Sequence, residues 1–188
     1  MTRDIVLGQA VIGTDTMTRK LGLALGGALL IALAAQVSVP MFPVPMTLQT
    51  LAVLLVGLTL GSRLGAATVA TYLGYGAMGL PVFAGGASAA ALMGPTAGFL
   101  FGFVAMAWLA GLAAERGVAR GFAGTLLAAL LVSAALYLPG LAWLATFTGV
   151  EKAVTLGALP FLLGDVVKAA LAALVVSGGW AALKGLRR

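Results

Sequence analysis

Long apolar stretches separated by short loops run through almost the whole sequence, and they limit the possible folds more than any single motif does. The chain of 188 residues is 62% hydrophobic and only 9% charged, whereas a soluble protein carries about 25% charged residues. Helices that cross a bilayer need about 20 apolar residues. We therefore expect an all-α integral membrane protein that is surrounded by the lipid bilayer.

Six stretches are candidates for membrane-spanning helices in a single membrane domain over residues 1–188. They lie near residues 21–37, 48–60, 65–78, 94–114, 122–138 and 161–183. The second and third are short for complete spans, so the segment 61–65 between them must form a tight turn. Residues 1–18 include Asp4 and Asp15 and lack an apolar core of signal-peptide length, which indicates a cytoplasmic tail.

Basic residues are distributed unequally between the two sides of this arrangement. With the N-terminus inside, Lys152 lies outside, Lys168 lies within a span, and the other nine of the 11 basic residues lie inside. The nine are Arg3, Arg19, Lys20, Arg63, Arg116, Arg120, Lys184, Arg187 and Arg188. The positive-inside rule predicts such a bias and explains the net charge of +6 without a nucleic-acid partner. Both termini should therefore be cytoplasmic, in a protein of the cytoplasmic membrane.

All seven prolines lie in or beside the outside connections. Pro40, Pro43 and Pro45 forbid a helix in the first outside loop and favour extended backbone. The second connection, residues 79–88, is apolar, rich in glycine and ends at Ser88. Irregular backbone at membrane depth requires surrounding protein or a water-filled cavity. The two loops therefore predict a pocket that opens to the outside.

Asp165 and Lys168 are the two charges that this topology cannot place outside the membrane. They are three residues apart, which on a helix is about 60° of rotation and about 4.5 Å of rise, so both lean toward one face. A charge in hydrocarbon costs on the order of 2.5–3.5 kcal/mol even on lenient scales. The pair either neutralises itself or binds a ligand with N–H donors and a carboxylate, and we favour the ligand site.

Other polar residues near the outside are open to two interpretations. Gln49, Thr47 and Thr50 begin the second span, where they either cap and connect helices or contact a ligand. Tyr72 and Tyr75 lie near the outer end of the third span, where they either anchor the protein at the interface or line the pocket. The position in the sequence does not decide between a structural role and a ligand-binding role for either set.

Small residues at every fourth position form ridges that allow helices to approach closely. Ala24, Ala28 and Ala32 form such a ridge on the first span. It packs either within the bundle or against a partner protein.

The composition also restricts the chemistry. The chain has no cysteine and no histidine, which removes thiolate catalysis and the usual zinc and haem ligands. No phosphate-binding P-loop sequence is present, so a partner subunit must hydrolyse any ATP that transport uses. One Asp and one Lys make a poor catalytic set, so we expect no enzyme, no metal and no cofactor.

Four runs of residues resemble the BioY family of biotin transporters. They are PVPMTLQTL at 43–51, GLPVF at 79–83, GPTAGFLFGF at 94–103 and PFLLGDVVK at 160–168. The resemblance extends from about residue 21 to the C-terminus, with the four runs in the family's order.

The resemblance implies the substrate-binding (S) component of an energy-coupling factor (ECF) vitamin transporter, which takes up biotin with high affinity. Its partners would be a transmembrane coupling subunit, which the family contacts through an alanine ridge such as Ala24, Ala28 and Ala32, and two ATPase subunits. Self-association without the ATPase module stays open. A different vitamin, or an assembly subunit without a ligand, is the alternative.

By this resemblance, Asp165 would accept from the ureido ring of biotin, and Lys168 would recognise a polar end, with the opposite arrangement open. Apolar residues such as Phe83 and Met93 would enclose the ring and tail. The complete predicted site is Asp165, Lys168, Gln49, Thr47, Tyr75, Phe83, Ser88 and Met93.

Overall fold

The structure is a computed structural model that describes residues 6–11 and 16–186. Most of these residues are helical. The helices are α1 (Leu7–Val11), α2 (Met17–Gln36), α3 (Gln49–Leu60), α4 (Ser62–Ala77), α5 (Ala97–Glu115), α6 (Phe122–Thr148), α7 (Val150–Gly157) and α8 (Leu162–Leu186). The strands β1 (Ser38–Val39) and β2 (Met46–Thr47) form a small hairpin, and the 3₁₀ turns are η1 (Ala84–Gly86), η2 (Ala89–Leu92), η3 (Val118–Arg120) and η4 (Leu159–Phe161).

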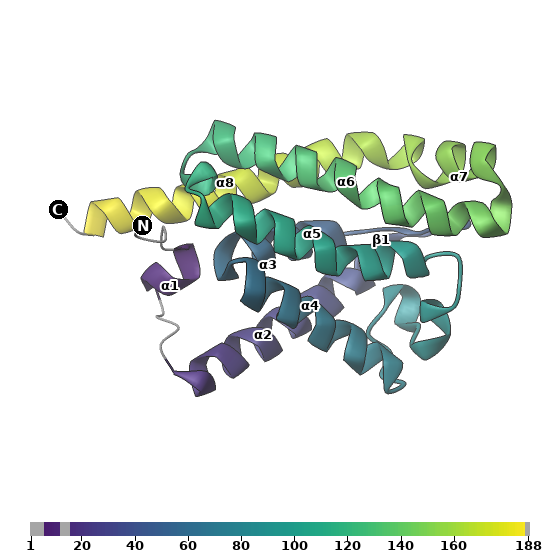
Figure 1. Cartoon of the computed structure of the whole chain (residues 1–188), viewed down its shortest axis with the longest axis horizontal. Helices are drawn as coiled ribbons and strands as arrows, with labels where there is room; N and C mark the ends of the chain where they lie inside the picture. Colours follow the sequence, from purple (N-terminus) through teal and green to yellow (C-terminus); the bar gives the residue numbers. More distant parts are fainter. Residues whose placement is uncertain (1–5, 12–15, 187–188) are drawn as a thin grey trace.

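The helices form one bundle in which α5 is central (Figure 1). It packs against α3 and α4 on one side and against α6 on the other, and α6 in turn packs against α8. Both ends of the described chain, with α1, lie at one end of the molecule, and α7 lies at the opposite end. The loop between α4 and α5 also lies toward the α7 end. The turns that carry the basic residues and the elaborate loops therefore occupy opposite ends.

Each of the six predicted apolar stretches contains a helix. Within residues 6–11 and 16–186, four helical segments are long and apolar enough to cross a membrane, namely Met17–Gln36, Ala97–Glu115, Phe122–Thr148 and Val150–Gly185. The helices α3 and α4 have only 12 and 16 residues, as the short second and third stretches predict. A count of six complete spans stays a prediction, and so does the cytoplasmic position of the termini.

The expected tail contains a helix that the sequence analysis missed. Val6 is 2% exposed and belongs to the main apolar core, and α1 packs against α3 and α8. A Cβ atom on Gly8 would lie 2.7 Å from the carbonyl oxygen of Thr59, so only a glycine fits there. Some charges that the sequence analysis places in the tail and at the C-terminus lie outside the described residues, namely those of Arg3, Asp4, Asp15, Arg187 and Arg188.

The fifth predicted stretch ended too early, at residue 138. The helix α6 continues through Pro139 to Thr148. A proline inside a helix removes one hydrogen bond and crowds the preceding turn, but close packing against α5 offsets the loss. Cβ atoms added at Gly98 and Gly102 would lie 2.5 Å from the Pro139 carbonyl oxygen and 3.0 Å from its ring. The proline therefore lies in the α5–α6 contact and does not end the helix.

The turn between α3 and α4 is as tight as the sequence predicts. Gly61 has φ +86° and its N–H donates to the Gly57 carbonyl, a conformation that costs glycine little. Glu115, at the end of α5, accepts hydrogen bonds from the backbone N–H and the hydroxyl of Ser62 at 2.7 and 2.8 Å. The carboxylate thereby caps the start of α4.

The alanine ridge on α2 faces the inside of the bundle. Ala24, Ala28 and Ala32 are 8%, 0% and 9% exposed, and α2 packs against α4 and α3. Its outer face carries exposed leucines, including Leu25 and Leu29. The ridge therefore packs within the chain in this structure, and a contact of Ala24, Ala28 and Ala32 with a partner subunit stays a prediction.

Candidate ligand-binding site

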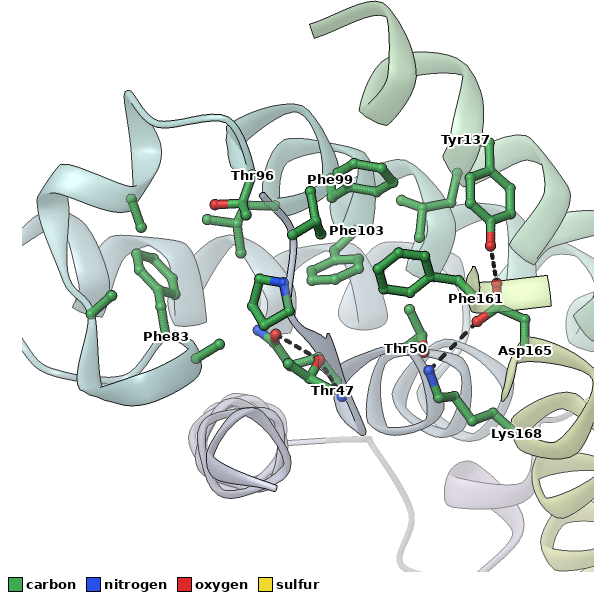
Figure 2. A pocket seen from close by; sticks show the side chains of 18 residues that line it. Thr47, Thr50, Phe83, Thr96, Phe99, Phe103, Tyr137, Phe161, Asp165 and Lys168 are labelled. Carbon is green, nitrogen blue, oxygen red and sulfur yellow. Dashed lines mark hydrogen bonds and ion pairs between the residues drawn. The ribbon is translucent and has the colours of Figure 1, made fainter. Parts of the chain in front are cut away.

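A cavity of about 190 Å³ lies among the hairpin loop, the α4–α5 loop and the helices α3, α5, α6 and α8 (Figure 2). It lies away from the end of the molecule that carries the two termini. Its lining is Val44, Pro45, Thr47, Gln49, Thr50, Phe83, Ala84, Ala87, Ala91, Thr96, Phe99, Leu100, Phe103, Leu136, Tyr137, Phe161, Asp165 and Lys168. The lining is mainly apolar with a few converging polar groups, which is typical of small-molecule sites.

The charged pole of the cavity consists of Asp165, Lys168 and Tyr137. The Lys168 ammonium lies 3.5 Å from Asp165 Oδ1, and the side chains are 7% and 13% exposed. The Tyr137 hydroxyl, from α6, donates to Asp165 Oδ2. Asp165 lies in the first turn of α8, where the helix dipole also favours its negative charge. Each carboxylate oxygen therefore has a partner, and the pair remains accessible from the cavity.

The neutral pole consists of Thr47, Gln49 and Tyr72. The Thr47 hydroxyl donates to Gln49 Oε1 at 2.9 Å, and Gln49 Nε2 donates to the Tyr72 hydroxyl at 2.6 Å. Gln49 begins α3 directly after the hairpin, so the strand β2 and the helix bring Thr47 and Gln49 together. Gln49 is 4% exposed and lines the cavity, while Tyr72 supports it from α4.

Aromatic rings form much of the wall: Figure 2 shows Phe99, Phe103 and Phe161 between the two poles and Phe83 on the far side of Thr47. Phe83 reaches in from the α4–α5 loop and is 2% exposed. Its ring stands edge-on to Tyr72, with ring centroids 5.3 Å apart. Phe161 belongs to a small buried cluster with Val44 of the hairpin loop. The loop between β1 and β2 therefore packs onto the ends of the helices.

Five of the eight predicted site residues line this cavity, and three do not. Asp165, Lys168, Gln49, Thr47 and Phe83 line it. Tyr75, Ser88 and Met93 do not belong to the lining. Met93 is 81% exposed, and Tyr75 packs against the main core.

Several residues of the site were not predicted from the sequence. Tyr137 lies in the fifth apolar stretch, which also contains the polar residues Thr125 and Ser133, so its hydroxyl did not stand out. Phe99, Phe103 and Phe161 look like ordinary apolar residues of a membrane span. Thr50 was considered and left open, and the structure gives it a distinct feature. Its Oγ1 is the one buried side-chain polar atom without a hydrogen-bond partner in the described part of the chain.

The described residues contain no group of three or more His, Cys, Asp or Glu side chains that could hold a metal ion. The charged groups that line the cavity are one carboxylate and one ammonium, both from α8. This arrangement can pair with complementary polar groups on a ligand and enclose an apolar part between the poles.

Known protein families include one that this sequence matches over nearly its whole length. The sequence model of the BioY family matches residues 7–185. The chain belongs to the BioY family.

Named relatives agree with that assignment. The chain is 45% identical over 147 residues to a probable biotin transporter BioY of Pyrococcus horikoshii, covering 78% of this chain and 86% of the relative. It is 41% identical over 150 residues to the biotin transporter BioY of Thermotoga maritima, with 78% and 86% covered. A crystal structure of the S-component for biotin from an ECF-type ABC transporter aligns with a TM-score of 0.76 at 24% identity, over 88% of this chain and 92% of that one. That likeness supports the fold.

Proposed function

We propose that this chain binds biotin and carries it into the cell as the S component of an ECF-type transporter. The observation that carries the proposal is the buried, ligand-accessible Asp165–Lys168 pair in a cavity of a BioY-family fold. Charged residues within membrane segments are costly and usually functional. Biotin is proposed as the solute because the P. horikoshii relative is a probable biotin transporter and the T. maritima relative is a biotin transporter.

The chemistry of biotin complements the two poles and the wall. Its ureido ring presents two N–H donors and a carbonyl acceptor, its fused rings are compact, and its aliphatic tail ends in a carboxylate. Asp165 offers a carboxylate acceptor and Lys168 offers donors beside it. A ligand carboxylate placed against Asp165 would be repelled, so Asp165 takes the N–H side of the ligand. Aromatic side chains such as Phe99 and Phe103 would cover the apolar rings and tail.

The distribution of basic residues supports an orientation that suits uptake into the cell. The described basic residues Arg63, Arg116 and Lys184 lie in turns or helix ends away from the cavity, and the positive-inside rule places that end in the cytoplasm. The cavity then opens to the outside of the cytoplasmic membrane. Energy would come from a transmembrane coupling subunit and two ATPase subunits, or from a self-associated form, and the chain itself would have no enzymatic role.

Calorimetric titration of biotin into the purified, detergent-solubilised chain tests the proposal. Wild type should bind, and Asp165→Asn and Lys168→Ala should each weaken binding by at least about 100-fold, because each leaves a buried partner unpaired. Glu151→Gln and Lys152→Ala are matched controls, since both side chains are exposed on α7, and they should bind as wild type does. A folded wild-type protein that does not bind biotin but binds another vitamin would overturn the assignment.

A further inference from the structure

Tyr72 lies behind the cavity and does not belong to its lining, yet it connects two parts of it. The side chain is 0% exposed. Its hydroxyl accepts from Gln49 Nε2 at 2.6 Å and donates to the carbonyl of Val82 at 3.2 Å. Gln49 belongs to the neutral pole, and Val82 precedes Phe83 in the α4–α5 loop. One buried hydroxyl therefore bridges a ligand-facing amide and the loop that forms part of the wall.

The carbonyl of Val82 fixes the direction of the whole hydrogen-bond chain. A carbonyl oxygen can only accept, so the single Tyr72 proton is directed to Val82. The Tyr72 oxygen must then accept, which requires the NH₂ side of the Gln49 amide to face it. The Gln49 Oε1 atom consequently faces Thr47, whose hydroxyl donates to it at 2.9 Å. Without this series of hydrogen bonds, the Gln49 amide could rotate by about 180°, so that its oxygen and its NH₂ group would exchange positions at the cavity.

The loop side of the bridge is held by further contacts. The Phe83 ring fills the space over Gly76, where an added Cβ would lie 2.0 Å from the ring. Gln36, at the end of α2, donates to the Phe83 carbonyl at 3.1 Å. Since the loop is fixed at these points, its Val82 carbonyl is a rigid acceptor that can orient Tyr72.

We propose that Tyr72 is a positioning residue that holds the Gln49 amide in one orientation toward the ligand and ties that orientation to the α4–α5 loop. The proposal rests on the proposed function, because it assigns the ligand contact to Gln49. Tyr72 itself does not touch the ligand. Its effect on binding should therefore depend on the presence of Gln49.

A double-mutant cycle tests this dependence, because such cycles separate a coupling from two independent losses. The proteins are wild type, Tyr72→Phe, Gln49→Met and the double variant, each titrated with biotin in the calorimeter. Tyr72→Phe keeps the ring in its packed position and removes only the hydroxyl. Tyr75→Phe, one turn further along α4 and outside the cavity lining, is the matched control. Thermal unfolding of each ligand-free protein verifies folding.

Tyr72→Phe should weaken biotin binding about fivefold in the wild-type background, as expected for a lost neutral hydrogen bond. In the Gln49→Met background the same substitution should change affinity by less than about twofold, which is within the usual error of additivity. Tyr75→Phe should bind as wild type does. Equal losses in both backgrounds, or no loss in either, would overturn the positioning role. Binding by the wild type in the same series tests the proposed function separately.

Discussion

The two poles of the cavity solve the problem of burying polar groups in a membrane protein in different ways. The charged pole uses a compact pair from one helix, Asp165 and Lys168, with Tyr137 as a single outside support. The neutral pole uses a chain of hydrogen bonds from Thr47 through Gln49 and Tyr72 to a loop carbonyl. The first is local in sequence, and the second spans the hairpin, two helices and a loop.

This difference predicts how each pole responds to substitution. A buried charge that loses its partner costs several kcal/mol, whereas a neutral hydrogen bond contributes about 1 kcal/mol net. Damage at the charged pole should therefore affect folding and binding together. Removing a single hydrogen bond of the neutral pole should affect binding with little change in stability, because the amide and hydroxyls there remain close to other partners.

The largest effect should follow from breaking the charged pair on one side only. Lys168→Met leaves the Asp165 carboxylate without its cation and should lower the free energy of unfolding by about 3–5 kcal/mol, with biotin binding lost. The double variant Asp165→Asn/Lys168→Met removes both charges and should recover most of that stability without recovering binding. Thermal unfolding and calorimetry measure the two quantities. If the double variant is as unstable as Lys168→Met, the unpaired Asp165 charge is not the cause of the lost stability.

A smaller loss is expected from Tyr137→Phe, which removes the hydroxyl donor to Asp165 and keeps the ring. Hydrogen bonds to charged groups contribute about 1.5–3 kcal/mol, so biotin affinity should fall by about tenfold or more. In the Asp165→Asn background the acceptor is neutral, and the same substitution should have a clearly smaller effect. An undiminished loss in that background would instead assign the Tyr137 hydroxyl, which lines the cavity, a direct contact with the ligand that does not depend on Asp165.

Gly76→Ala should disturb the neutral pole through the loop. The added methyl group would lie 2.0 Å from the Phe83 ring, so the ring must leave its place, at a cost of about 1–3 kcal/mol in unfolding free energy. Gly74→Ala is a matched control on the same helix, because its added Cβ would meet nothing within 4 Å. Urea or thermal unfolding and biotin titration should show losses for the first variant alone. Equal behaviour of the two variants would contradict the anchoring role of Phe83.

The same comparison explains which parts of the site could be predicted from the sequence. Asp165 and Lys168 are adjacent on one helix turn and are conspicuous among aliphatic residues, so their place in a pocket follows from helix geometry and from the cost of burying charge. The partner Tyr137 lies 28 residues earlier in the chain. Only the packing of α6 against α8 brings it to Asp165, and apolar stretches alone do not specify how helices pair.

The parts of the fold that depend on neighbouring residues in the sequence could be predicted. Composition predicted the helices, Gly61 predicted the tight turn, and the prolines predicted an extended first loop. The structure differs from the prediction, or the sequence left the outcome open, where contacts between helices determine the end of a helix or the surface that it buries. Pro139 was read as the end of a helix, but its contact with α5 keeps it inside one. A ridge of small residues does not reveal which surface it faces, so the sequence left the alanine ridge of α2 open between the bundle and a partner. In this structure the ridge packs within the chain.

The smallest expected effect concerns Thr50, which lies beside both poles at the start of α3. Elsewhere in the helices, Thr59, Thr68 and Thr125 donate to the carbonyl four residues earlier. The corresponding residue for Thr50 is Met46, which belongs to strand β2 and not to the helix. The Thr50 hydroxyl is therefore left without a protein partner among the described residues and lines the cavity.

Thr50→Val replaces this hydroxyl with a methyl group of similar size. The ligand-free protein should be as stable as wild type or slightly more stable, because a buried hydroxyl without a partner carries a desolvation cost. Biotin affinity should fall by about 1 kcal/mol, or about fivefold, if the ligand supplies the missing partner. Thr68→Val, which breaks a bond to Leu64 away from the cavity, should show the reverse, with reduced stability and unchanged affinity. Unchanged affinity for Thr50→Val would instead assign the hydroxyl to a bound water, and it would restrict ligand recognition to the two poles.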